Sequence, residues 1–251
     1  MQVATGKSIL NGIAIGPLRI YKKKETETAV TSNLTPEEEY ARFDAARVKA
    51  QEQLGGLYNK ALDEVGEDNA SIFEIHQMML DDDDYLDAVK GIIETQNATA
   101  EYAVSTTGEN FAAAFAAMED EYMRARAADV KDISRRVVNV LLGVGDAEMM
   151  DDKPAILVAD DLTPSETVQL DKTKLLGFIT RHGSSNSHTA ILARTMNIPA
   201  LIGVDFQDDW DGKLAVIDGY NHCVYIEPAP ELLSAMEEKR SGDLKQEALL
   251  Q

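Results

Sequence analysis

Length, composition and charge exclude several classes of protein. The chain has 251 residues, enough for one large domain or two modest ones, and 44% of them are hydrophobic, so a packed core is expected. Acidic residues outnumber basic residues by 44 to 24, and the net charge of −20 argues against binding nucleic acid, whose phosphates are held mainly by Lys and Arg. A macromolecular partner of this chain is expected to be basic.

The cysteine content and the apolar runs of the sequence indicate the cellular compartment. The single cysteine, Cys223, excludes an internal disulfide, which is consistent with a reducing cytoplasm. No apolar run approaches the length of a membrane-spanning helix, and the N-terminus lacks the pattern of a signal peptide. We therefore expect a soluble cytoplasmic protein that makes no membrane contact.

The first half of the chain changes from strands to helices. Residues 9–21 (ILNGIAIGPLRIY) predict short strands with a turn at Gly16-Pro17. A helix start follows at Thr35-Pro36-Glu37-Glu38, with Thr35 as N-cap and Glu38 completing a capping box. We expect Gly55-Gly56 to weaken the far end of this helix. Further helices are predicted over residues 70–80, 83–95, 100–118 and 120–142. In the last of these, a narrow apolar face is predicted for Tyr122, Val130, Ile133, Val137 and Val140. Antiparallel helices joined by short loops form a bundle.

The second half alternates strands with short helices. Apolar runs bounded by turn residues predict strands at 155–159, 175–180, 200–204, 214–218 and 223–227. Helical segments begin at Thr163 and near Ser187 between them, which indicates an α/β layer. A polar helix closes the chain. The resulting fold class is an α/β domain, residues 1–24 and 145–229, with an inserted all-α helical-bundle domain, residues 25–144, followed by a C-terminal linker helix, residues 230–251.

His188 stands apart from the other histidines, His76, His182 and His222, because of its surroundings. A predicted strand runs into a loop rich in Gly, Ser and Asn, and His188 follows in the first turn of a helix. This layout resembles a phosphate cradle, in which a helix N-terminus stabilises an anion by about 0.3–1 kcal/mol. A histidine at a helix start can equally be a capping residue with a solvent-facing ring, and the residues alone leave both interpretations open. The chain has no Walker pattern, and no second His or Cys lies at metal-ligand spacing from His188.

Several segments together resemble Enzyme I, the phosphoenolpyruvate-protein phosphotransferase family of the bacterial sugar phosphotransferase system. Residues 183–194 and 161–167 (DLTPSET) resemble its phosphohistidine domain, and GIAIGPLRIY resembles its opening strands. Residues 71–80 (SIFEIHQMML) and 124–132 (RARAADVKD) resemble the helical domain that docks the phosphocarrier protein HPr. The SHTAI motif is shared with pyruvate phosphate dikinase and phosphoenolpyruvate synthase, whereas the helical segments point to Enzyme I.

The resemblance implies roles for two residues. His188 matches the histidine that accepts phosphate from phosphoenolpyruvate and passes it to HPr. Thr167 matches a threonine whose hydroxyl hydrogen-bonds that ring. From the residues alone, Thr167 is better explained by a local backbone hydrogen bond in a short helix.

An acidic surface is the expected docking site for HPr. Residues 61–89 include ten acidic residues and no Lys or Arg, and such a negatively charged surface suits a basic partner. The positions that match the family's HPr-binding groove are Glu67, Asp68, Glu74, His76, Met78, Met79, Asp82, Asp84, Tyr85 and Arg126. One of the two methionines can equally belong to the core, and His76 can pack rather than dock.

Two positions depart from the family pattern, and much of the family's length is absent. Ser184 replaces a second glycine, and Asn69 stands where relatives have a lysine that reaches the phosphoryl group. Family members are more than twice as long, with a C-terminal barrel that binds phosphoenolpyruvate and Mg²⁺ and forms the dimer. We therefore expect an N-terminal half that is monomeric, binds no cofactor or metal, and only exchanges phosphate with HPr.

Two other functions stay open at this point. One is the phosphohistidine subunit of a dihydroxyacetone kinase, which borrows Enzyme I-like domains. The other is a non-catalytic acidic docking module that keeps the α/β layer as a scaffold. An acid-labile phosphohistidine would separate either enzyme from the docking module.

Overall fold

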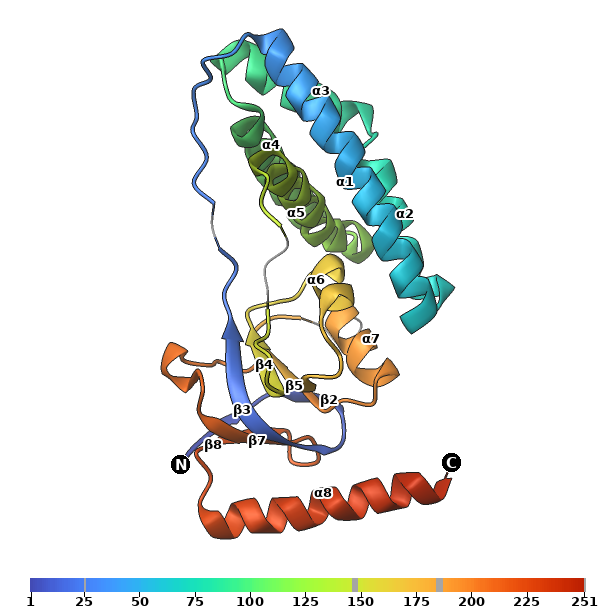
Figure 1. Ribbon diagram of the computed structural model, residues 1–251, viewed down its shortest axis with the longest axis vertical. Coiled ribbons are helices and arrows are strands. Elements are labelled where there is room, and N and C mark those ends of the chain that lie inside the picture. Colours follow the sequence, from blue (N-terminus) through green and yellow to red (C-terminus); the bar gives the residue numbers. More distant parts are fainter. Residues whose placement is uncertain (25, 146–148, 184–186, 251) are drawn as a thin grey trace. The chain divides into compact units, whose positions relative to one another are not determined.

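The computed structural model describes residues 1–24, 26–145, 149–183 and 187–250 (Figure 1). The chain divides into two compact units. The α/β unit comprises Met1–Lys24, Glu148–Leu162 and Gln169–Gln251, and the helical unit comprises Glu25–Ala147 and Thr163–Val168. The predicted fold class, an α/β domain with an inserted helical bundle and a C-terminal helix, is confirmed.

The helical unit is built on five helices that follow one another along the chain. They are α1 (Pro36–Val65), α2 (Glu67–Met79), α3 (Asp83–Gln96), α4 (Ala100–Ala116) and α5 (Glu121–Leu142). Figure 1 shows α1 alongside α2 and α4 alongside α5. The predicted capping box opens α1: the Thr35 hydroxyl accepts the Glu38 N–H, and the Glu38 carboxylate accepts the Thr35 N–H at 2.8 Å.

The first helix is longer than its glycines suggested. It continues through Gly55-Gly56 to Val65, because Leu54 and Leu57 on either side are both buried in the core of the unit. Tertiary packing supplies most of the stability of a helix in a protein, and here it outweighs the conformational cost of two glycines. The predicted apolar face of α5 also needs one correction, since Tyr122 lies at the surface.

The α/β unit contains one mixed sheet among its described residues. Its strands are β1 (Gln2–Thr5), β2 (Lys7–Leu10), β3 (Ile13–Tyr21), β4 (Ala155–Ala159), β5 (Leu175–Thr180), β6 (Ala200–Ile202), β7 (Leu214–Asp218) and β8 (Cys223–Ile226), in the order β1-β8-β7-β3-β4-β5-β6-β2. Neighbouring strands from β3 to β6 run parallel. The carboxyl ends of β4, β5 and β6 therefore lie along one edge of the sheet, where parallel sheets usually bind ligands.

The predicted turn at Gly16-Pro17 is wrong, because β3 runs straight through these residues. Ile13 to Pro17 pair with β7 in antiparallel fashion, and Leu18 to Tyr21 pair with β4 in parallel. Pro17, which has no N–H to donate, lies where pairing with one neighbour ends and pairing with the other begins. The proline is therefore accommodated without a break in the strand.

Helices α6 (Pro164–Gln169), α7 (His188–Thr195) and α8 (Pro230–Leu250) and the short 3-10 turn η1 (Asp208–Trp210) complete the elements. Residues 163–168 belong to the helical unit, although the sequence analysis assigned them to the α/β domain. Val168 is buried in the helical core, and the Ser165 N–H points to Asp132 of α5 at 3.4 Å. Helix α8, the predicted linker, is counted with the α/β unit, where the Lys239 ammonium lies 4.1 Å from the centre of the Tyr220 ring. Among the described residues, no helix is long and apolar enough to cross a membrane.

Candidate functional site

His188 occupies the first position of helix α7, as the sequence predicted. The Ser187 hydroxyl caps the helix by accepting the Ala190 N–H at 3.3 Å, and the Ser187 carbonyl accepts the Ile191 N–H at 3.0 Å. The His188 side chain is half-buried. It is thus fixed to a capped helix N-terminus, where a negative charge is stabilised by the helix dipole.

A glycine and two buried threonines lie close to His188 in the sequence. Gly183 has a φ of +123°, which a residue with a side chain rarely adopts, and a β-carbon at this position would lie 3.6 Å from the Ser187 hydroxyl and 3.7 Å from the Thr180 hydroxyl. Thr180 and Thr189 are both buried, and their hydroxyl groups have no hydrogen-bond partner in the part of the chain that the structure describes. The predicted departure at Ser184 lies outside the described residues. The sequence alone did not single out either threonine, although Thr180 lies three residues before the motif of residues 183–194 and Thr189 lies within it.

Thr167 lies on α6, in the helical unit, whereas His188 lies in the α/β unit. Its buried hydroxyl donates a hydrogen bond of 2.8 Å to the Pro164 carbonyl, which is the local backbone bond considered from the sequence. A capping box between Thr163 and Glu166 starts the helix. Since the only hydroxyl proton of Thr167 is engaged, the oxygen can still accept a hydrogen bond but cannot donate a second one.

Most of the predicted docking residues are exposed on the helical unit. The acidic members all face solvent, and they are Glu67, Asp68, Glu74, Asp82 and Asp84. The Asp82 carboxylate also caps α3 by accepting the Tyr85 N–H at 3.1 Å. Met78 is 72% exposed, whereas Met79 is half-buried and packs against the core. The two methionines therefore divide between the surface and the core.

Two predicted docking residues are corrected, because they are buried. His76 is completely inaccessible, and its Nε2 atom lies 3.0 Å from a carboxylate oxygen of Asp129 on α5. Tyr85 is buried as well, and its hydroxyl lies 2.8 Å from the Ser134 hydroxyl. Burial raises the pKa of Tyr85 above its ordinary value, so this phenol stays neutral. Neither side chain can touch a partner directly, and both instead join the helices that carry the acidic surface.

The remaining predictions concern Arg126, Asn69 and metal binding. Arg126 is partly covered, and its guanidinium donates to Asp129 at 2.9 Å. The Asn69 amide, which replaces a lysine of the family, donates to the Val65 carbonyl at 2.9 Å. Within the described residues, no group of three or more His, Cys, Asp or Glu side chains is arranged to hold a metal ion.

Comparisons with known proteins match both units. Residues 5–126 match the N-terminal domain of the PEP-utilising enzymes, and residues 151–222 match their mobile domain. The solution NMR structure of an Enzyme I protein (nEIt) is 33% identical, with a TM-score of 0.74, and the match covers 95% of this chain and 98% of that one. The chain belongs to the Enzyme I family. The N-terminal domain of Enzyme 1-Nitrogen is also similar, at 26% identity and a TM-score of 0.60 over 95% of this chain and 99% of that one.

Curated members of the Enzyme I family extend well beyond this chain. The phosphoenolpyruvate-protein phosphotransferase of Bacillus sp. (strain S) is 38% identical over 94% of this chain, but the match covers only 41% of that protein. The enzyme of the same name from Bacillus subtilis (strain 168) is also 38% identical, over 99% of this chain and 44% of its own length. The 251 residues thus span about two fifths of these Enzyme I relatives.

Proposed function

We propose that this chain carries a phosphoryl group on His188 and exchanges it with a histidine of HPr, in the first step of the sugar phosphotransferase system in the cytoplasm. The observation that carries the proposal is the position of His188 at the capped N-terminus of α7, the next helix after the parallel strand β5, in a member of the Enzyme I family. The exposed acidic residues of α2 and α3 support a basic partner such as HPr.

The transfer needs little covalent chemistry from other side chains. The lone pair of an unprotonated His188 nitrogen attacks the phosphorus of phosphorylated HPr in line, the N–P bond to the HPr histidine breaks, and its electron pair returns to that ring. Each ring keeps the proton on its other nitrogen, so no general acid or base is required. Catalysis then comes from positioning the His188 nitrogen in line with the phosphorus and from the dipole of α7, which stabilises the negative charge of the phosphoryl group.

Thr167 is proposed to orient the His188 ring by hydrogen bonding. Because its proton is donated to the Pro164 carbonyl, the Thr167 oxygen offers a lone pair, which suits a ring N–H as donor. A ring held in this way would present its other nitrogen, with a free lone pair, to phosphorus.

We propose that phosphoenolpyruvate acts only through the part of the longer relatives that this chain does not match. The Enzyme I relatives are more than twice as long as this chain, and we propose that any Mg²⁺ is bound in that additional part. We therefore expect the 251 residues by themselves to be a monomer that takes phosphate from phosphorylated HPr, without Mg²⁺, and takes none from phosphoenolpyruvate.

The test is incubation with phosphorylated HPr followed by intact mass measurement at neutral and acid pH. We expect a gain of one acid-labile phosphate in the wild type, and none in His188→Ala, which should still bind HPr. His182→Ala is the matched control: it removes an exposed histidine from the same connection and should keep the phosphate. Phosphorylation of His188→Ala would refute the assignment, and HPr binding without any mass gain would leave a non-catalytic docking module.

A further inference from the structure

Helix α6 lies between two strands of the sheet in the sequence, but it belongs to the helical unit. Residues 163–168 are part of the connection between β4 and β5, which are parallel, and a helix in such a connection ordinarily packs against its own sheet. Val168 is instead buried in the core of the helical bundle. With only six residues, α6 is too short to be stable by itself, so its orientation depends on its contacts with that bundle.

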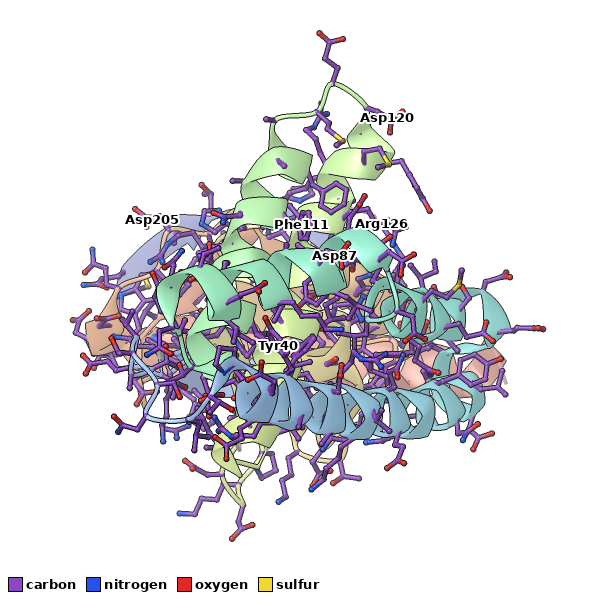
Figure 2. The ribbon with its side chains drawn as sticks, turned by 90° about the horizontal axis from the view of Figure 1, so that it is seen from above. Tyr40, Asp87, Phe111, Asp120, Arg126 and Asp205 are labelled. Atoms are coloured by element: carbon purple, nitrogen blue, oxygen red, sulfur yellow. The ribbon has the colours of Figure 1, made fainter. Side chains whose placement is uncertain are left out.

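Asp132 of α5 contacts the beginning of α6. It lies in the middle of α5, beyond Asp120 and Arg126, which Figure 2 labels in the first part of that helix. Its buried carboxylate accepts a long hydrogen bond of 3.4 Å from the Ser165 N–H, and it lies 3.9 Å from Nδ1 of the fully buried His76. Because a hydrogen bond is directional and this carboxylate is shielded from water, the contact limits how α6 can rotate on α5.

Arg135 makes a second contact with the same short helix. Its exposed guanidinium lies 3.9 Å from a carboxylate oxygen of the largely buried Glu166. Glu166 also accepts the Thr163 N–H at 2.8 Å, so its carboxylate closes the capping box of α6 as well. Asp132 and Arg135 are three residues apart and therefore lie on the same face of α5. This face of α5 contacts α6 at Ser165 and at Glu166.

The orientation of α6 determines where the Thr167 oxygen points. The Thr167 hydroxyl donates to the Pro164 carbonyl within α6, so the direction of its free lone pair is set by the helix itself. A rotation of α6 would turn that lone pair away from the His188 ring N–H, to which the proposed function assigns it. Groups that orient reactants lose much of their effect when they are displaced by about 1 Å.

We propose that Asp132 and Arg135 are positioning residues for phosphoryl transfer, which hold α6 so that the Thr167 oxygen accepts the N–H of the His188 ring. In this role neither side chain contacts the phosphoryl group, and both act through Thr167. The helical unit then contributes to the reaction itself, in addition to recognising the partner. This inference rests on the proposed function, because it takes Thr167 to orient His188.

Removal of the buried carboxylate is the first test. Asp132→Ala should lower kcat for phosphate uptake from phosphorylated HPr about ten-fold, with KM unchanged, in protein that circular dichroism shows to be folded. Glu101→Ala is the matched control: it removes another buried carboxylate of the helical unit, on α4, where it pairs with Arg42, and it should keep the wild-type kcat. A wild-type kcat for Asp132→Ala, or an equal loss in the control, would overturn the role of Asp132.

Two milder substitutions carry less risk to folding. Asp132→Asn keeps the shape but offers a weaker acceptor, and should lower kcat about three-fold. Arg135→Ala removes an exposed partner and should lower kcat about two-fold, because exposed ion pairs are weak, whereas Arg135→Lys should restore most of the loss. A wild-type kcat in both Asp132→Asn and Arg135→Ala would overturn the positioning role.

Thr167→Val shows whether Asp132 acts through Thr167. This substitution keeps the shape of the side chain but removes the hydroxyl, so adding Asp132→Ala to it should lower kcat no further. The nitrogen chemical shifts of the His188 ring, measured by NMR without HPr, should move in Asp132→Ala toward those of Thr167→Val, because both lose the hydrogen bond that holds the ring. Additive losses in kcat, or wild-type shifts in Asp132→Ala, would overturn the inference.

The same measurements separate this inference from the function on which it rests. If the wild type takes no phosphate from phosphorylated HPr, the proposed function fails and this inference fails with it. If Thr167→Val has the wild-type kcat, the role proposed for Thr167 fails, again together with the inference. If Thr167→Val is slow but Asp132→Ala is as fast as the wild type, only the inference fails.

Discussion

The two units of the chain differ in the kind of buried polar group that lies near their candidate functional residues. In the helical unit, the buried charges are paired: Glu39 with Arg42 and Asp129 with both His76 and Arg126. In the α/β unit, the buried hydroxyls of Thr180 and Thr189, which flank His188 in the sequence, have no partner among the described residues. The helical unit also has such hydroxyls, on Thr107 and Ser165. Buried pairs lock the helices that carry a recognition surface, whereas unpaired hydroxyls keep hydrogen-bonding capacity near the reactive residue.

The two units can be followed separately in one unfolding experiment. Trp210 is the only tryptophan of the chain and is buried in the core of the α/β unit. Its fluorescence therefore reports on that unit. Far-ultraviolet circular dichroism is dominated by helices, and α1 to α5 lie in the helical unit, whereas the α/β unit contributes α8 and the short α7. A substitution that affects one unit should move one signal more than the other.

The largest expected effect comes from Glu39. Its buried carboxylate accepts hydrogen bonds from Arg42 at 2.7 Å and from the Ala100 N–H at 2.9 Å, and it also pairs with the Ser32 hydroxyl. Glu39→Ala leaves the Ala100 N–H and the Ser32 hydroxyl without this acceptor near the starts of α1 and α4, whereas Arg42 keeps Glu101 as a partner. We expect a loss of about 3–5 kcal/mol in the free energy of unfolding of the helical unit, measured in urea by circular dichroism.

The control for this prediction is Glu37→Ala, which removes an exposed carboxylate from the same first turn. It should cost about 0.3–1 kcal/mol through the helix dipole alone. Equal losses in the two variants would show that burial of the Glu39 network has no special role, and the comparison between the two units would lose its strongest example.

Local chemistry made much of the fold predictable from the sequence. The Thr35 capping box located the start of α1, and apolar runs between turn residues located β4, β5 and β7. His188 could be placed at a helix start because Ser187 is a good N-cap after a Gly- and Ser-rich loop. In each case the decisive signal lies within a few residues of the feature.

The errors occurred where the decisive contact comes from a distant part of the chain. The burial of His76 depends on Asp129, 53 residues later, and that of Tyr85 depends on Ser134, 49 residues later. The membership of α6 in the helical unit depends on packing of Val168 and on Asp132. Such partners cannot be read from periodicity, because a polar side chain on a helix face is compatible with both surface and core.

A smaller effect is expected when one hydroxyl is removed from a buried pair. Ser134→Ala leaves the buried Tyr85 hydroxyl without its partner at 2.8 Å, and should cost the helical unit about 1–3 kcal/mol. Adding Tyr85→Phe removes the orphaned group as well, so the double variant should recover part of the loss. Circular dichroism in urea measures both changes. A double variant as unstable as the sum of the single ones would contradict the pairing.

The smallest effect, of opposite sign, is expected at Thr180. Thr180→Val replaces a buried hydroxyl that has no partner in the described structure with a methyl group of similar shape, at the end of a strand that suits β-branched residues. We expect the α/β unit to keep its stability or gain up to about 1 kcal/mol, measured by Trp210 fluorescence in urea.

This hydroxyl also provides the sharpest test of the comparison between the units, because its proton remains available for an anion near Ser187 and Gly183. If that capacity serves the phosphohistidine, Thr180→Val should take phosphate from phosphorylated HPr more slowly, with unchanged HPr affinity. A loss of stability similar to that of Ser134→Ala would instead show that Thr180 is paired in solution. Thr180 would then not be an example of an unpaired buried hydroxyl near the reactive residue.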